Sequence, residues 1–94
     1  MPLTTDKTVN PIKVTGTTSS DTEVFGEPIF VKFLYWYKPT TAGHLLALKT
    51  KTGSDIAPLR CEVDDESQII PIFTEFKNIH IDDMDSGALY IFHP

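Results

Sequence analysis

Three stretches of the chain are apolar on both of the faces that a β-strand would present. They are Phe30–Tyr37, Ile69–Phe73 and Ala88–Phe92. A strand that packs on a core with one face and meets water with the other alternates apolar and polar residues. A chain of 94 residues forms one modest core, which cannot easily cover both faces of three strands. We therefore expect neighbouring copies or a partner to cover the surplus, which indicates assembly rather than chemistry.

Turn-forming residues recur about every ten residues from Pro28 onward, which is the spacing of short antiparallel strands. The expected strands are Phe30–Tyr37, His44–Lys49, Asp55–Val63, Gln68–Phe73, Asn78–Asp82 and Ala88–His93. Thr74–Lys77 is expected to form a single helical turn or an irregular crossing. No stretch of ten or more residues has a 3.6-residue period. The chain is therefore predicted to be all-β, a small antiparallel β-sandwich of six or seven strands with a jelly-roll-like or immunoglobulin-like form.

The composition changes near Glu27, which predicts two parts. Residues 1–27 are rich in Thr and have few large apolar side chains, as expected for an extended N-terminal arm. Residues 28–94 form the predicted β-sandwich domain.

Two short strands are possible within the expected arm. Val9–Thr15 predicts an edge strand with Ile12 and Val14 on one face, because Pro11 lacks an N–H and fits only at an edge. Thr22–Phe25 is a weaker candidate.

Charge and cysteine content exclude several classes of partner and site. The chain has 13 acidic and 8 basic residues, a formal net charge of −5. Its basic residues are scattered, so neither nucleic acid nor a membrane is an expected partner. Residues 1–7 lead into no apolar secretory segment, and no apolar run approaches the ~20 residues that span a bilayer. We expect a soluble protein made in the cytosol, a compartment that suits a single cysteine.

The lone cysteine and the histidines do not predict a catalytic or metal site. Cys61 shares a strand face with Leu59 and Val63, so a buried structural role is favoured over a nucleophile. The three histidines lie too far apart in sequence for a local metal motif. His80 alternates with isoleucines beside Asn78 and Asp82, a pattern typical of a solvated strand face.

Two acidic turns, Asp64–Glu66 and Asp82–Asp85, contain oxygen ligands of the kind that Ca²⁺ prefers. Neither has the spacing of an EF-hand, and Asp, Ser and Gly are common in turns for conformational reasons. Turn chemistry is therefore favoured, with calcium binding as the alternative. We expect no enzymatic activity and no cofactor.

Alternation along Phe30–Tyr37 places Trp36 on one strand face and Phe33, Tyr35 and Tyr37 on the other. Trp36 is expected in the core, and the split disfavours a sugar-stacking platform built from all the aromatic residues. Tyrosine is enriched in interface cores. The expected interface residues are Phe33, Tyr35, Tyr37, Ile12 and Val14.

The segments LYWYKPTTAGHLLALKTKTGSDI and NIHIDDMDSGALYIF resemble the small β-sandwich proteins in the virions of tailed bacteriophages. The matching residues are Gly43, Leu46, Leu48, Gly53, Ser86, Gly87, Leu89 and Ile91, with Asn78 where those proteins have a glycine. The resemblance covers about residues 28–93.

The resemblance implies a structural virion component without catalytic residues. It favours a capsid decoration or head-associated protein, made in the host cytoplasm, that binds the shell through apolar strand faces and its N-terminal arm. Its expected partners are further copies of itself, as a homo-oligomer, and a capsid or other virion protein. The alternatives are a ligand- or carbohydrate-binding β-sandwich module and a subunit of a cellular complex.

Overall fold

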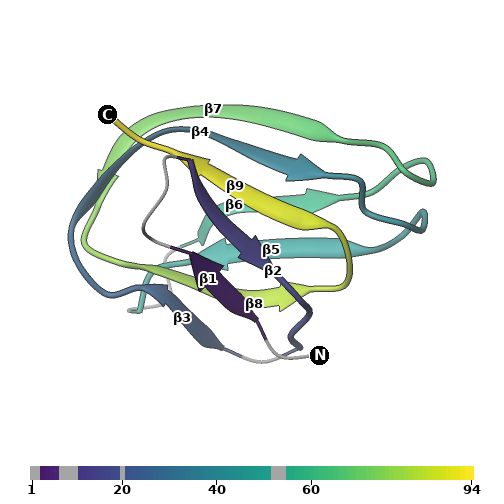
Figure 1. Ribbon diagram of the computed structural model, residues 1–94, viewed down its shortest axis with the longest axis horizontal. Helices are drawn as coiled ribbons and strands as arrows, with labels where there is room; N and C mark the ends of the chain where they lie inside the picture. The colour runs from purple at the N-terminus through teal and green to yellow at the C-terminus, as the bar shows by residue number, and fades with distance from the viewer. Residues whose placement is uncertain (1–2, 7–10, 20, 52–54) are drawn as a thin grey trace.

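The computed structural model describes residues 3–6, 11–19, 21–51 and 55–94. Over these residues the protein has no helix and consists of two antiparallel sheets that pack face to face (Figure 1). The predicted all-β class and its antiparallel sandwich arrangement are confirmed.

The larger sheet has five strands in the spatial order β1-β2-β9-β4-β7. They are β1 (Thr4–Asp6), β2 (Ile12–Thr15), β9 (Ala88–Phe92), β4 (Ile29–Tyr37) and β7 (Gln68–Phe76). The C-terminal strand β9 lies between β2 and the long β4 and pairs with both. β7 forms one edge and follows β4 over nearly its whole length.

The smaller sheet has four strands in the order β3-β8-β5-β6. They are β3 (Thr22–Phe25), β8 (Ile79–Met84), β5 (Leu45–Lys49) and β6 (Asp55–Arg60). Apart from the β1–β2 and β5–β6 hairpins, the connections between consecutive strands cross from one sheet to the other. Strands far apart in sequence therefore become neighbours.

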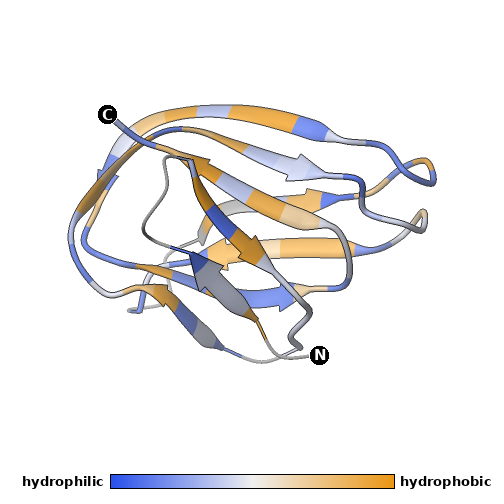
Figure 2. Cartoon of the chain, viewed as in Figure 1, coloured by the Kyte–Doolittle hydropathy of each residue, from blue (hydrophilic) through white to orange (hydrophobic). Residues whose placement is uncertain are grey.

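The core lies between the sheets and contains the inward-facing residues of both. Its fully buried members include Ile12, Val14, Leu34, Trp36, Leu46, Leu48, Ile79, Ile81, Leu89 and Ile91. Fully burying one such aliphatic side chain contributes about 1.5–3 kcal/mol. Apolar residues predominate along β5, along β9 and along the first part of β7 (Figure 2), so some of them must face outward.

The strand count differs from the prediction. Nine strands are present in the described residues, and β1 was not expected because its polar sequence has no apolar alternation. The helical turn or irregular crossing expected at Thr74–Lys77 is wrong, since β7 continues to Phe76. The strand continues because its register with β4 shifts at this point and Phe73 takes a positive φ of 51°.

The predicted N-terminal arm is not confirmed. β2 is an interior strand between β1 and β9, and β3 is an edge of the smaller sheet. Ile12 and Val14 are 1% and 0% exposed, and Val24 of β3 is 2% exposed. Although the segment has few apolar residues, these three point into the core, which composition alone does not reveal. Val9, Asn10 and Gly53, named in the expectations above, lie outside the described residues.

Candidate functional site

The outer face of the larger sheet carries a cluster of aromatic side chains that we call the aromatic face. Its members are Phe33, Tyr35 and Tyr37 of β4 and Tyr90 and Phe92 of β9. All except Tyr37 are half-buried, and Tyr37 is 41% exposed. The sheet buries its other face against the core, so these rings form a surface rather than part of the interior.

Strand register brings these rings together. Phe33 is directly opposite Phe92, and Tyr35 is directly opposite Tyr90. Cross-strand partners on one face of a sheet have Cβ atoms about 4.5–5.5 Å apart, close enough for ring contact. The pairing of β4 with β9 therefore builds the face from segments more than fifty residues apart.

The alternation along β4 is interrupted. Ile29 and Val31 are buried before the register shift, whereas Leu34 and Trp36 are buried after it. Leu34 and Trp36 thus share the buried face, and Val31, which strict alternation would put on the same face as Phe33, is buried with them. The interruption leaves Phe33 beside Tyr35 on the outer side.

The rings contact one another in specific geometries. Phe33 and Phe92 stack with centroids 4.4 Å apart and planes 28° apart. Tyr35 and Tyr90 lie 6.0 Å apart at 30°, and Tyr37 meets Tyr90 edge-on at 6.4 Å. In each stacked pair, one ring covers a flat face of the other. The Lys13 ammonium lies 5.8 Å from the Tyr90 centroid, at cation–π range.

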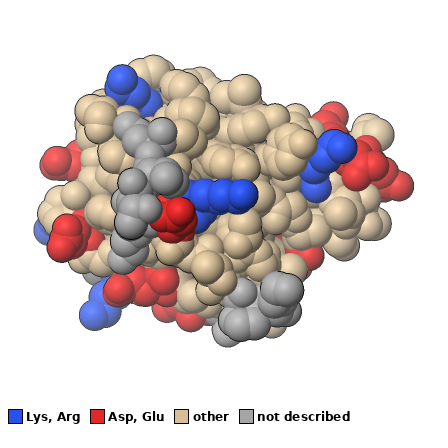
Figure 3. Space-filling view, in the orientation of Figure 1, with Lys and Arg blue, Asp and Glu red and all other residues tan. Residues whose placement is uncertain are grey.

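Further apolar residues extend this surface toward the β7 edge. Ile69, directly opposite Tyr35, is 62% exposed, and Phe30 is 39% exposed. In the orientation of Figure 1, the space-filling view shows few charged side chains over β9 and β4, with most of the charge toward the periphery (Figure 3). The aromatic face is thus continuous with a wider apolar area.

Three of the five expected interface residues lie together on this surface: Phe33, Tyr35 and Tyr37. The other two, Ile12 and Val14, do not, because β2 directs both into the core. No partner can reach these two side chains without unfolding the strand, so their assignment to an interface is corrected.

Tyr90 and Phe92 belong to the aromatic face, although sequence reasoning did not assign them there. The sequence does contain a signal for this face, because Ala88, Tyr90 and Phe92 alternate along β9 with two residues that are buried. Only the strand order, which places β9 beside β4, shows that these rings complete the cluster.

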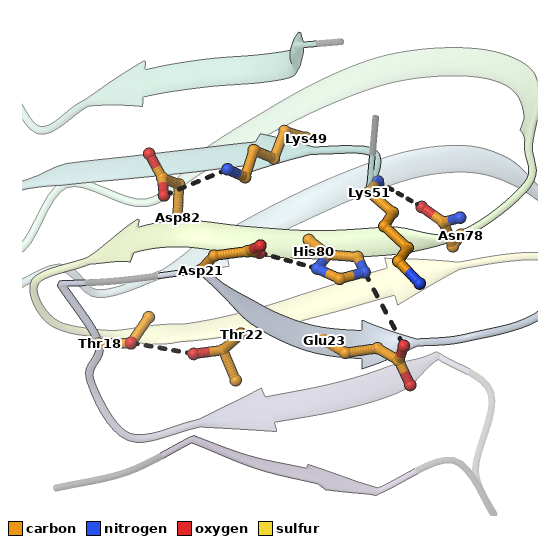
Figure 4. Close-up of polar contacts among 9 residues, drawn as sticks. All are labelled: Thr18, Asp21, Thr22, Glu23, Lys49, Lys51, Asn78, His80 and Asp82. Carbon is orange, nitrogen blue, oxygen red and sulfur yellow. Dashed lines mark hydrogen bonds and ion pairs between the residues drawn. The ribbon is translucent and has the colours of Figure 1, made fainter. Parts of the chain in front are cut away.

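A second cluster of contacts, which is polar, surrounds His80 on the outer side of the smaller sheet (Figure 4). The Asp21 carboxylate accepts a hydrogen bond from His80 Nδ1 at 2.7 Å. Glu23, directly opposite on β3, holds Oε2 3.9 Å from Nε2, which has no hydrogen-bond partner among the described residues. His80 is only 6% exposed, so the solvated strand face expected for it is wrong.

Gly26 lies beside the Glu23 carboxylate. A Cβ at Gly26 would lie 2.9 Å from Glu23 Oε1, so a larger residue there would displace this carboxylate. Glu23, Phe25, Gly26 and Glu27 line an open cavity of about 360 Å³. Lys49 forms an ion pair with Asp82 at 3.5 Å on the same sheet. The His80 contacts thus attach the edge strand β3 to β8.

A third cluster closes one end of the sandwich. Ser86 Oγ lies 2.7 Å from His44 Nδ1 and accepts the Thr40 N–H, while the Ser86 carbonyl accepts the Trp36 indole N–H at 2.9 Å. A Cβ on Gly87 would lie 2.7 Å from the Tyr37 carbonyl, and its φ is +81°. These bonds dock the β4–β5 loop on the β8–β9 turn.

Two carboxyl groups beside that turn, those of Asp83 and Asp85, interact with each other. The pKa of Asp83 is raised to about 6. Burial is the largest cause, followed by hydrogen bonding to Asp85 and by the negative charges of Asp85 and Asp82. The hydrogen bond from Asp83 lowers the pKa of Asp85, which also accepts the Leu45 N–H. Asp85 thereby joins the β8–β9 turn to Leu45 of β5.

Cys61 is completely buried, as the sequence predicted. Its Sγ lies 3.0 Å from the Val63 carbonyl, to which the thiol donates. Val63, expected on the same inward face, is instead 60% exposed because β6 ends at Arg60 and the chain turns.

Over the described ranges, no group of three or more His, Cys, Asp or Glu side chains could hold a metal ion. The same part of the chain has no helix long and apolar enough to cross a membrane. Comparison of the chain with family models, with curated proteins and with solved structures finds no match.

Proposed function

We propose that the protein is a non-enzymatic structural protein that assembles through its aromatic face. The single observation that carries the proposal is the cluster of five ring side chains on the outer side of a sheet whose inner side already forms the core. A monomer has no need of such a surface, whereas a protein–protein contact does.

The chemistry of the face suits a protein partner. Tyr and Phe are enriched in the cores of protein interfaces, where charged residues are depleted. The stacked pairs already hold their rings in fixed positions, so binding costs little side-chain entropy. Tyr35, Tyr37 and Tyr90 keep hydroxyl groups that can bond to a partner or to interfacial water.

We place this assembly role in the virion of a tailed bacteriophage, most simply as a capsid decoration or head-associated protein. The motive is the resemblance of residues 28–93 to small virion β-sandwich proteins. In this setting the chain is made in the host cytoplasm, associates with copies of itself and attaches to a capsid or other virion protein. Neither nucleic acid nor a membrane is a proposed partner.

A carbohydrate ligand is the second candidate, and one observation favours it. The structure gathers Tyr35, Tyr37 and Tyr90 on one face, whereas the sequence suggested a divided platform. Pyranose rings stack on the flat faces of aromatic side chains. Here two ring pairs stack, and a ring in such a pair has one flat face covered by its neighbour, which favours the protein partner.

Co-sedimentation tests the proposed function. Purified protein is mixed with the expanded shell of the phage that carries its gene, and the bound fraction is measured as the protein concentration rises. Saturable binding with a fixed copy number per shell is expected. Absence of binding to the shell, together with retention on a glycan array, would contradict the proposal and favour the carbohydrate module.

A further inference from the structure

We infer that the partner of the aromatic face is a second copy of the chain, packed face to face in a two-fold dimer. The inference rests on the proposed function, because it takes the aromatic face as the contact surface. It adds that the partner is a second copy and that the two larger sheets face each other, so the smaller sheet of each copy faces outward. Three features of the structure support it.

The first feature is the pair of prolines on the long edge strands. β7 carries Pro71 at the centre of its pairing with β4, and β6 carries Pro58 opposite Ala47 of β5. Proline has no N–H, so an edge strand that contains one is a poor template for a further strand. Association by extending the sheets at β7 or β6 is therefore disfavoured, and the other two edges, β1 and β3, are strands of only three and four residues.

The second feature is the charge on this side of the molecule. The outward rows of the larger sheet contain two acidic residues, Asp6 and Glu75, and two basic residues, Lys13 and Lys32. This face is neutral although the whole chain carries −5. A two-fold interface brings like patches together, which costs least where the patch has no net charge. A partner of opposite charge would instead fit the acidic surfaces elsewhere.

The third feature is size. Four strand spacings of about 4.8 Å, across strands of three to nine residues, give a face of roughly 20 by 20 Å. Its flat area, counted on both copies, is roughly 800 Å², which is the size of a small, reversible interface below about 1,200 Å². A dimer through this face, which includes the exposed Ile69, should therefore form in the micromolar range.

Sedimentation equilibrium across low to high micromolar concentrations tests the inference. The wild-type chain should reach twice its monomer mass and no more. Tyr37→Arg places a charge on the face and should raise the dimer dissociation constant at least about tenfold. Leu45→Arg is the matched control, because Leu45 is 42% exposed and Tyr37 is 41% exposed, but Leu45 lies on β5 of the smaller sheet. The control should dimerise as the wild type does.

Near-ultraviolet circular dichroism of the buried Trp36 shows that each variant stays folded. A wild-type monomer, a larger ring, or equal effects of the two arginine variants would overturn the inference. A monomer that still binds the phage shell through the aromatic face would overturn it while leaving the proposed function intact. If the wild type forms a dimer that Tyr37→Arg dissociates, but the protein does not bind the phage shell, the inference would be supported and the virion role contradicted.

Discussion

Phe33 on β4 stacks on Phe92 on β9 with their ring centroids 4.4 Å apart, and this contact joins the two central strands on the outer side of the sheet. Stacked aromatic pairs contribute about 0.5–1.5 kcal/mol beyond the area that they bury. Phe33→Ala and Phe92→Ala should therefore show a coupling free energy of that size in a double-mutant cycle measured by urea unfolding. Phe30→Ala with Phe92→Ala is the control cycle and should be additive. Additivity in both cycles would contradict the prediction.

Cys61 should be unreactive in the native protein, because its thiol is fully buried and donates to the Val63 carbonyl. Labelling with a thiol reagent should be slow until the protein unfolds. Cys61→Ser should lower the free energy of unfolding by about 1–3 kcal/mol, at the lower end if its hydroxyl keeps the bond to Val63. Rapid labelling of the native protein would contradict this prediction.

The matched control for that experiment introduces a cysteine two positions away. Cys61→Ala combined with Val63→Cys places the thiol at a position whose native side chain is 60% exposed. This variant should be labelled rapidly under the same native conditions. The difference between the two rates then measures the burial of Cys61 rather than the quality of the reagent.

Most strands could be predicted from alternation and turn residues, because both act within a few residues of the chain. The central part of β4 and the whole of β5 follow from this information alone. β1 could not be predicted, since a short polar strand is stabilised by pairing with β2 rather than by its own pattern. The same reason explains why β7 continues beyond Phe73, where the register with β4 shifts.

The candidate site could be predicted only in part. The surplus of apolar residues identified Phe33, Tyr35 and Tyr37 as outward-facing. Their partners on β9 depend on which strands are neighbours, and local sequence does not contain the strand order. The burial of His80 has the same origin, because Asp21 lies 59 positions away in the sequence.

The N-terminal segment is part of the core, so its loss should prevent folding rather than only weaken assembly. Ile12→Ala and Val14→Ala should each lower the free energy of unfolding by about 2–4 kcal/mol, because each leaves a cavity in a packed interior. Lys13→Ala, on the exposed face of the same strand, should change it by less than about 1 kcal/mol. Similar values for all three variants would restore the interpretation of residues 1–27 as an arm.

The bond between Asp21 and His80 should stabilise the edge strand β3. Asp21→Ala leaves the buried Nδ1–H without its acceptor and should cost about 1–2 kcal/mol in urea unfolding. Glu23→Ala is the control, since its carboxylate lies 3.9 Å from Nε2 and is 59% exposed, and it should cost less. Hydrogen exchange of the β3 amides should accelerate in the first variant. A larger loss for Glu23→Ala would show that the 3.9 Å contact is the stronger one.

The carboxyl pair at Asp83 and Asp85 should make stability fall as pH rises from about 4 to about 7. The pKa of Asp83 is raised from 3.8 to about 6, mainly by burial, so in this range the folded protein holds a proton that the unfolded chain has released. The stability that this proton contributes is complete below the pKa of Asp83 in the unfolded chain, and it is lost as the pH rises through the pKa of Asp83 in the folded protein. Asp83→Asn cannot ionise, and its amide can still donate to Asp85. Between these pH values, the free energy of unfolding of the variant should therefore rise by about 1 kcal/mol relative to that of the wild type, after allowance for screening.

Thermal unfolding across this pH range provides the measurement. The melting temperature of Asp83→Asn should rise relative to that of the wild type as pH increases, with the two nearly equal near pH 4. Asp65→Asn is the matched control, the same exchange at an exposed turn residue whose φ of 62° asparagine tolerates. Its curve should stay parallel to the wild-type curve. If the Asp83→Asn curve is parallel as well, burial and the contact with Asp85 do not raise the pKa of Asp83 in the folded protein.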